Sequence, residues 1–331
     1  MDERVVSNMG CFVISLDYEL LWGGIEKRFP DDYGKSNVQH VPEVLDRLVT
    51  LFEKYGVHAT VATVGLIMED NPEKALAASP QKKPSYEMSF LSPYNNGYIT
   101  KIKKKDESLY FAPVSIKKLK ESGNIEVATH TFCHYYCWEK GQTIEEFKED
   151  IECAINAARK HNVDLKSIIF PRNEVTDDYL RVCSDFGITS YRGNPKHFFN
   201  KQKNKVARII QRVLRIADTY INISGHNTYS IDELDINEGC VNVPASRFLR
   251  PYSKKLSLLD GLRFRRIKKD IRYAAKHNQL YHLWWHPHNF GNHINENMLF
   301  LEKILNEYSH CHAKYGMRSY TMHEIQEIRT I

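Results

Sequence analysis

The sequence predicts an α/β fold in which helices surround a parallel sheet or a β/α barrel. Short apolar runs typical of buried strands recur along the chain, helical patterns lie between them, and polar residues directly follow several runs. Strands that alternate with helices favour parallel pairing, with the helices as crossovers. The 331 residues, of which 42% are hydrophobic and 26% charged, suffice for one large domain or two smaller ones.

The first third of the chain contains two expected strands, one helix and a long irregular segment. CFVISL at 11–16 is the first strand, and it ends at the charged Asp17. A helical pattern begins after Pro42, and VHATVATVG at 57–65 is the second strand. Residues 66–121 have five prolines and a KIKKK cluster but no clear periodicity. We therefore expect a long insertion or lid at about 66–121.

The rest of the chain alternates more regularly between the two patterns. NIEVAT at 124–129 is the third expected strand. Residues 143–161 form an amphipathic helical pattern, in which Thr143 is the N-cap and Glu146 completes a capping box. Further strands are expected at 167–170, 188–191 and 280–285, and further helices at 176–186 and 295–313.

Polar clusters directly follow four of the expected strands. They are Asp17-Tyr18-Glu19, His130 with His134, Pro171-Arg172-Asn173-Glu174, and His286-Pro287-His288. In parallel β/α barrels the C-terminal ends of the strands meet at one mouth, where reactive residues collect. Each cluster alone has an ordinary structural explanation, as a helix cap, a surface ion pair or a pair of core histidines. Four clusters at four strand ends predict a common site.

Two of these residues, His130 and His134 in the motif HTFCH, have a spacing at which two imidazoles can share a metal ion. A catalytic zinc ion takes three protein ligands and leaves one position open. Asp17 or Glu19 would supply the third ligand, and the other acid would be free to act as a base. The sequence therefore predicts a metal site built from strand ends.

The seven cysteines are irregularly spaced, and residues 1–10 lack the apolar region of a signal peptide. No apolar run approaches the length of a transmembrane helix. We therefore expect a cytoplasmic protein with reduced thiols. Cys133 and Cys137 lie close to two histidines, but a structural zinc site usually has a second ligand pair elsewhere, so we interpret both as packing residues.

The net charge of +5 is unevenly distributed along the chain. Residues 196–215 contain seven Lys or Arg and no acid, and residues 250–276 contain ten against Asp260 and Asp270. Such stretches suit an anionic partner, either an anionic membrane surface contacted peripherally or a substrate phosphate. A solvated basic surface is the ordinary alternative. No nucleic-acid-binding motif is present, so we expect no nucleic acid partner.

In this order the motifs SLDYE, HTFCH, FPRNE and LWWHPH resemble those of the polysaccharide deacetylase family, the NodB-homology carbohydrate esterases that include carbohydrate esterase family 4. The resemblance spans about residues 11–330. It implies a distorted, incomplete (β/α)7 barrel of the NodB-homology type. It also implies a single catalytic domain over 1–331, with the insertion or lid at about 66–121.

The resemblance also implies roles for individual residues. Asp17 corresponds to the general base, and Arg172 to the arginine that orients it. Glu19, His130 and His134 correspond to the metal ligands. His286 corresponds to the general acid, with His288 as a competing candidate. Tyr18 separates acids that are adjacent in the commonest family pattern, so the choice of Asp17 or Glu19 as ligand stays open.

The implied activity is metal-dependent removal of an N-acetyl or N-formyl group from a sugar, with Asp17 deprotonating the attacking water and His286 protonating the leaving amine. The metal would be Zn²⁺, with Co²⁺ or Ni²⁺ as alternatives. The expected substrate is a nucleotide- or lipid-linked precursor of a surface polysaccharide. Two alternatives remain: an allantoinase-like amidohydrolase acting on a non-sugar amide, and a non-catalytic carbohydrate-binding barrel.

Overall fold

One sheet organises the fold, which a computed structural model describes over residues 9–195, 214 and 216–331. The strands are β1 (Cys11–Tyr18), β2 (Ala59–Thr63), β3 (Ile125–Thr129), β4 (Ser167–Ile168), β5 (Ser190–Tyr191), β6 (Ile236–Asn237), β7 (Cys240–Asn242), β8 (Arg247–Phe248), β9 (Leu280–Trp285) and β10 (Arg318–Tyr320). Their order is β6-β7-β5-β4-β3-β2-β1-β9-β8, and β10 also pairs with β1. Among the named strands of the described residues, β6 and β7 pair antiparallel and the other pairs are parallel; an isolated antiparallel bridge also joins Tyr229 to Leu280 of β9.

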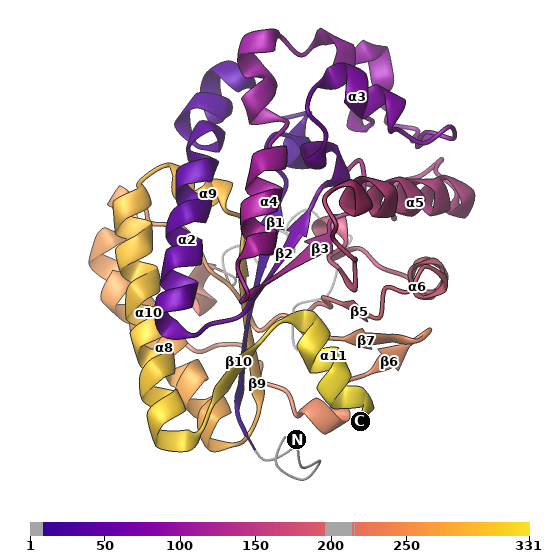
Figure 1. Ribbon diagram of the computed structural model, residues 1–331. Coiled ribbons are helices and arrows are strands. Elements are labelled where there is room, and N and C mark those ends of the chain that lie inside the picture. The colour runs from indigo at the N-terminus through magenta and orange to yellow at the C-terminus, as the bar shows by residue number, and fades with distance from the viewer. Residues whose placement is uncertain (1–8, 196–213, 215) are drawn as a thin grey trace.

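Helices surround the sheet, which curls into a half-barrel (Figure 1). The helices are α2 (Val41–Tyr55), α3 (Pro72–Ala77), α4 (Pro113–Glu121), α5 (Ile144–Lys160), α6 (Asp177–Asp185), α8 (Asp260–Lys276), α9 (His288–Gly291), α10 (Ile294–Tyr315) and α11 (Met322–Thr330). In Figure 1, α2, α8 and α10 lie to the left of the sheet, and α5 and α6 lie to the right. The architecture confirms the predicted incomplete β/α barrel.

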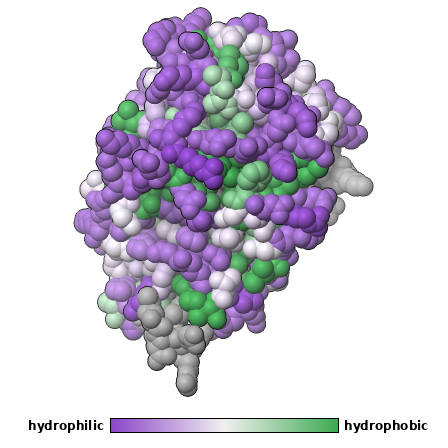
Figure 2. Space-filling view, turned by 45° about the vertical axis from the view of Figure 1, so that its right-hand side comes forward, coloured by the Kyte–Doolittle hydropathy of each residue, from purple (hydrophilic) through white to green (hydrophobic). Residues whose placement is uncertain are grey.

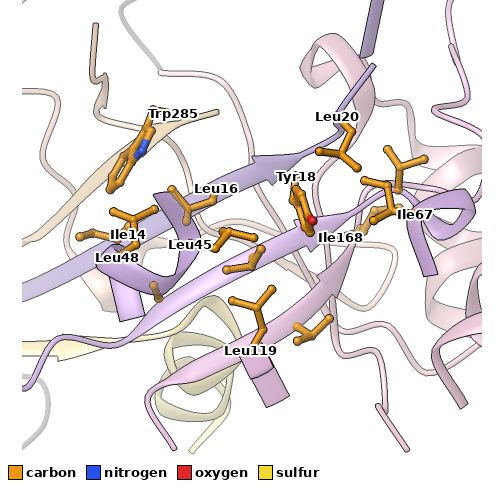
Figure 3. Close-up of a cluster of buried hydrophobic side chains, with 14 of the residues drawn as sticks. Ile14, Leu16, Tyr18, Leu20, Leu45, Leu48, Ile67, Leu119, Ile168 and Trp285 are labelled. Carbon is orange, nitrogen blue, oxygen red and sulfur yellow. The ribbon is translucent and has the colours of Figure 1, made fainter. Parts of the chain in front are cut away.

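Strand β1 occupies the centre of the sheet, and all eight of its residues are buried. Because side chains alternate along a strand, Ile14, Leu16 and Tyr18 share one face. They pack there against the helical layer, as Figure 3 shows. The opposite face carries Ser15 and Asp17, which therefore point into the half-barrel. A strand that is buried on both faces thus carries its polar residues to the interior.

Local sequence signals account for the best-predicted helices. Helix α2 has Pro42 in its first turn and ends at Gly56, whose φ of 58° provides the left-handed C-cap. Helix α5 begins at the predicted capping box: the Thr143 side chain accepts from the Glu146 amide, and the Glu146 side chain accepts from the Thr143 amide. These signals fix the bounds of both helices to within a residue or two.

The irregular segment 66–121 differs in part from expectation. It contains α3 and several short 3-10 turns, but its last nine residues form α4. Ile116 and Leu119 of α4 are buried in the main core, where α4 packs against β3. The end of the segment is thus part of the helical layer, because its apolar residues recur at helical spacing. Across the described ranges, every helix is too short or too polar to span a bilayer.

Leu48 and Leu258 provide a matched test of this core. Leu48 of α2 is 1% exposed, whereas Leu258 is 98% exposed. We expect Leu48→Ala to lower the free energy of unfolding by about 2–5 kcal/mol, because it leaves a cavity in the core. Leu258→Ala should change it by less than about 0.5 kcal/mol. Chemical denaturation measures both values, and equal losses would contradict the packing described for α2.

Candidate active site

The four polar clusters meet in one cavity of about 910 Å³ at the C-terminal ends of the strands. The lining residues from these clusters are Asp17, Glu19, His130, His134, Arg172, Asn173 and His286. Hydrophilic residues cover most of the face seen in Figure 2, and a band of hydrophobic residues crosses its middle. The structure therefore brings together residues that lie up to 269 positions apart in the sequence.

The Glu19 carboxylate lies between two histidines at the bottom of this cavity. Glu19 is 2% exposed; its Oε1 lies 2.7 Å from His286 Nε2, and its Oε2 lies 3.5 Å from His134 Nε2. A Cβ atom on Gly23 would lie 0.9 Å from Glu19 Oε2, so only glycine leaves room for this side chain. Burial alone would raise the pKa of Glu19, but the charges of His286 and Arg28 hold it well below its usual value.

Glu19, His130 and His134 form a donor set that fits a divalent metal ion. One ligand atom from each residue lies within 4.8 Å of the other two. His130 Nδ1 lies 2.7 Å from the Ile169 carbonyl oxygen, so Nδ1 carries the proton and Nε2 is the nitrogen left for a metal. Burial lowers the pKa of His130, and it lowers the pKa of His134 to about 3. Both imidazoles are therefore neutral near pH 7, as metal ligands must be.

The loop that carries the two histidines is held by Asp150 of α5, which the sequence analysis missed. The buried Asp150 carboxylate accepts from the Phe132 amide at 2.7 Å and from the Cys133 amide at 3.0 Å. Thr131 and His134 have φ values of 64° and 61°, a left-handed conformation that is costly for such residues. The hydrogen bonds to Asp150 stabilise this strained turn. The sequence did contain a signal for this role, because Asp150 is a charged residue on the buried face of the predicted helix 143–161.

Asp17 is bound by Arg192, which is 1% exposed. Arg192 Nη1 and Nη2 donate to the two Asp17 carboxylate oxygens at 2.7 and 2.8 Å. Arg192 Nε and Nη2 also donate to Asn173 Oδ1, and the guanidinium carbon lies 4.0 Å from the Trp284 ring centroid. Burial alone would raise the pKa of Asp17, but the charges of Arg192 and His286 lower it below its usual value.

This contact corrects the role that the sequence assigned to Arg172. Arg172 lies in the cavity wall, but it donates to Glu139 Oε1 at 2.6 Å and lies over the Tyr136 ring. Arg192 holds Asp17 instead, and the motif FPRNE contributes to that contact through Asn173. Arg192 directly follows the expected strand 188–191, so the rule applied to the other strand ends would have identified it.

A second polar chain leads from Arg192 into the interior. Arg192 Nη1 donates to Ser15 Oγ at 3.0 Å, and Ser15 Oγ lies 2.7 Å from His282 Nε2. The other ring nitrogen of His282 lies 3.1 Å from the Val243 carbonyl oxygen. Burial lowers the pKa of His282 to about 3, so this imidazole is neutral. Ser15, supported by His282, thus helps to hold the Arg192 guanidinium in place; the sequence analysis did not single out either residue.

The two late histidines occupy different places. The His286 side chain is 19% exposed and lines the cavity, where its Nε2 lies 3.7 Å from Asp17 Oδ2. His288 is 1% exposed and is not among the residues that line the cavity. Of the two candidates for the acid, His286 is therefore the one that can contact a molecule in the cavity.

Aromatic and basic side chains also line the cavity. They are Tyr136, Trp138, Phe248 and Trp284, with Lys27, Arg28, Arg172, Arg247 and Arg250. Aromatic rings offer flat apolar faces, and basic side chains attract anionic groups. The cavity can therefore hold a substrate that has both flat apolar faces and anionic groups.

Residues 31–191 match the family model described as polysaccharide deacetylase, which covers His130, His134 and Arg172. No curated protein matches the sequence. A candidate polysaccharide deacetylase from Mycobacterium smegmatis has a similar structure, with 14% identity, a TM-score of 0.58, and coverage of 98% of this chain and 91% of that chain.

Two glycan-processing enzymes also have similar structures. They are a GH57-type branching enzyme from Pyrococcus horikoshii (12% identity, TM-score 0.55, 96% of this chain and 70% of that chain) and the α-amylase AmyC from Thermotoga maritima (12% identity, TM-score 0.52, 96% and 74%). At these identities the likeness shows a shared fold.

Replacing either arginine by methionine should lower the free energy of unfolding, but by different amounts at Arg192 and Arg172. Arg192→Met should lower the free energy of unfolding by about 3–5 kcal/mol, because it leaves the buried Asp17 charge without its partner. Arg172→Met should cost about 0–1 kcal/mol, because its ion pair with Glu139 is partly exposed. Chemical denaturation measures both, and adding Asp17→Asn should restore part of the loss in the Arg192 variant. A larger loss in the Arg172 variant would argue against this assignment.

Proposed function

Because residues 31–191 match the polysaccharide deacetylase family model, we propose that the chain is a metal-dependent hydrolase that removes an N-acetyl or N-formyl group from a sugar. The family supports sugar deacetylation in general, and a hydrolase acting on amide bonds. The observation that carries the finer proposal is the convergence of Glu19, His130 and His134 beside the Asp17–Arg192 pair.

Glu19, His130 and His134 would hold the divalent cation. Two imidazoles and one carboxylate suit Zn²⁺, and Co²⁺ or Ni²⁺ bind comparable ligands. When bound, such an ion polarises the acyl carbonyl group and lowers the pKa of a coordinated water. Asp17 is not needed as a ligand, because Arg192 already engages both of its oxygens.

Asp17 and His286 would move the protons of the reaction. Asp17 accepts the proton of the attacking water as the new carbon–oxygen bond forms. Arg192 keeps Asp17 ionised near pH 7, because it stabilises the charged carboxylate. His286, on the other side of Glu19, donates a proton to the sugar nitrogen as the carbon–nitrogen bond breaks. The products are a carboxylic acid and the free amine.

The cavity lining supports the proposed substrate class. Aromatic faces such as Trp138 and Trp284 suit the apolar faces of a sugar ring, and Lys27, Arg28 and Arg172 would attract an attached phosphate. We therefore favour a cytoplasmic nucleotide- or lipid-linked precursor over the non-sugar amide of an allantoinase-like enzyme. The non-catalytic alternative is weaker, because the cavity combines a candidate ligand set with a candidate base and a candidate acid.

A hydrophobic surface beside the cavity favours the lipid-linked form. The leucine patch consists of Leu256, Leu258, Leu259 and Leu262, which are 37–98% exposed, and the exposed Lys254 and Lys255 precede it. Arg263 of α8 donates to the Arg250 carbonyl oxygen, and Arg250, which lines the cavity, donates to Thr219. Exposed leucines beside lysines are typical of a surface that docks on an anionic bilayer.

The basic stretch 250–276 contributes less charge to this surface than its sequence suggests. At least four of its ten cations form ion pairs with described residues: Arg263, Arg266, Lys268 and Arg272. The other basic stretch, 196–215, lies outside the described residues except for Leu214. Lys254 and Lys255, next to the leucine patch, are therefore the residues to replace in a test of membrane contact.

Removing the proposed base should lower kcat without lowering the zinc content, whereas removing the proposed ligands should lower the zinc content. Asp17→Asn should lower kcat for release of acetate or formate by at least about 100-fold, with the zinc content unchanged. His130→Ala combined with His134→Ala should lose the zinc itself. Elemental analysis and assays on nucleotide- and lipid-linked acylated sugars measure both. If wild-type protein supplied with zinc stays metal-free, the metal-dependent mechanism is wrong.

Lys254→Gln combined with Lys255→Gln should weaken binding to vesicles that contain phosphatidylglycerol by roughly 30-fold, at about 1 kcal/mol for each lysine. Lys103→Gln with Lys105→Gln, two exposed lysines in the segment 66–121, is the matched control and should bind as the wild type does. Co-sedimentation measures the binding. Equal binding by all three proteins would remove the membrane from the proposal.

A further inference from the structure

We infer that Glu19 and His286 of the cavity lining, together with the buried His288, form a second, weaker divalent-cation site, and that a cation bound there inhibits the enzyme. The inference rests on the proposed function, because inhibition requires His286 to be the general acid. The binding site itself rests only on geometry. The two parts can therefore be tested separately.

The position of Glu19 is the first observation. Its two oxygens face different histidines: Oε2 lies 3.5 Å from His134 Nε2, and Oε1 lies 2.7 Å from His286 Nε2. Ligand atoms of Glu19, His286 and His288 lie within 4.8 Å of one another, as do those of Glu19, His130 and His134. Glu19 thus belongs to two ligand sets, and each carboxylate oxygen serves one of them.

His288 is the second observation, and it is independent of the first. Its side chain is 1% exposed, and neither ring nitrogen has a hydrogen-bond partner among the described residues. Leaving a buried polar group unsatisfied is unfavourable, so such groups are rare without a ligand or a bound water. The ring is held by an edge-on contact with Tyr33, and the Asn37 side-chain amide donates to the His288 carbonyl oxygen. A fixed imidazole with unused nitrogens suits a metal ligand.

Electrostatics require the second site to be the weaker one. Both ligand sets share the single negative charge of Glu19, and two divalent cations at neighbouring sites repel each other. Arg28 Nη1 adds a further positive charge, 3.4 Å from Glu19 Oε2. The first cation should therefore bind tightly, and the second should bind only at excess metal.

Occupation of this site would remove the general acid. A cation coordinated by His286 Nε2 takes the position of the proton that this nitrogen would donate to the leaving amine. The displaced proton goes to solvent. His286 is then a metal ligand, and the carbon–nitrogen bond can break only without its help.

The test is a calorimetric titration of the metal-free full-length chain with zinc chloride. Wild-type protein should bind one equivalent tightly and a second at least about 100-fold more weakly. His288→Leu should lose the second phase and keep the first, whereas His130→Ala with His134→Ala should lose the first. His161→Gln, a histidine outside the cavity, should behave as the wild type does. If His288→Leu fails to fold, as judged by circular dichroism, His288→Gln replaces it.

Activity gives the second measurement. In the wild type, excess zinc should lower activity at least about 100-fold relative to one equivalent, because the general acid is lost. In His288→Leu the activity at excess zinc should stay close to the activity at one equivalent. A single equivalent in the wild type, or a second phase that survives His288→Leu, overturns the second site. Loss of both phases in a folded His288→Leu variant also overturns it, because the first ligand set does not include His288.

These outcomes are distinct from failure of the proposed function. If the first equivalent binds and the second does not, the deacetylase proposal stands and only this inference falls. If the double histidine variant retains the tight phase, the proposed ligand set is wrong instead. Both zinc equivalents without inhibition would support the site but overturn its effect on His286.

Discussion

The ion pair between Asp17 and Arg192 depends on, and fixes, the curvature of the sheet. Arg192 follows β5 and Asp17 lies on β1, and three strands separate them in the sheet order. In a flat sheet, four inter-strand spacings would place β5 and β1 about 19 Å apart, far beyond the reach of an arginine side chain. The two bonds of 2.7 and 2.8 Å form only because the sheet curls. The same curl brings the strand ends around one cavity, so the site and the half-barrel share one geometric cause.

The interior of the half-barrel is polar and buried, and its groups are stable there because each charge has a partner. Arg192 balances Asp17, Ser15 and a neutral His282 support the arginine, and Asp150 holds the loop that carries the strained Thr131. Removing one member would leave the others buried without partners. Separately, the position of Glu19 leaves no room for a side chain at Gly23.

Much of the fold could be predicted from the sequence because its longest elements have clear periods. The expected strands 11–16 and 280–285 and the helix 143–161 match β1, β9 and α5 closely. Strands β4 and β5 span two residues each and lie inside the expected strands 167–170 and 188–191. Arg192 directly follows the second of these and was missed because a lone arginine did not stand out as a polar cluster; Asp150 was missed because its partners are amides of a loop that only tertiary contacts fix. The strand-end rule gathered the other candidates correctly but could not give the direction in which Arg172 points.

The position of β1 also determines when the cavity can form during synthesis. Strand β1 is made within the first 18 residues, yet it pairs with β9 near residue 280 and with β10 near residue 318. On a ribosome β1 therefore has an unpaired edge until β9 and β10 have emerged. Contacts this distant in sequence slow folding, and the exposed edge of a very apolar strand invites pairing with other chains. The nascent protein should consequently depend on chaperones more than its size alone suggests, and the cavity forms only after β9 has been made.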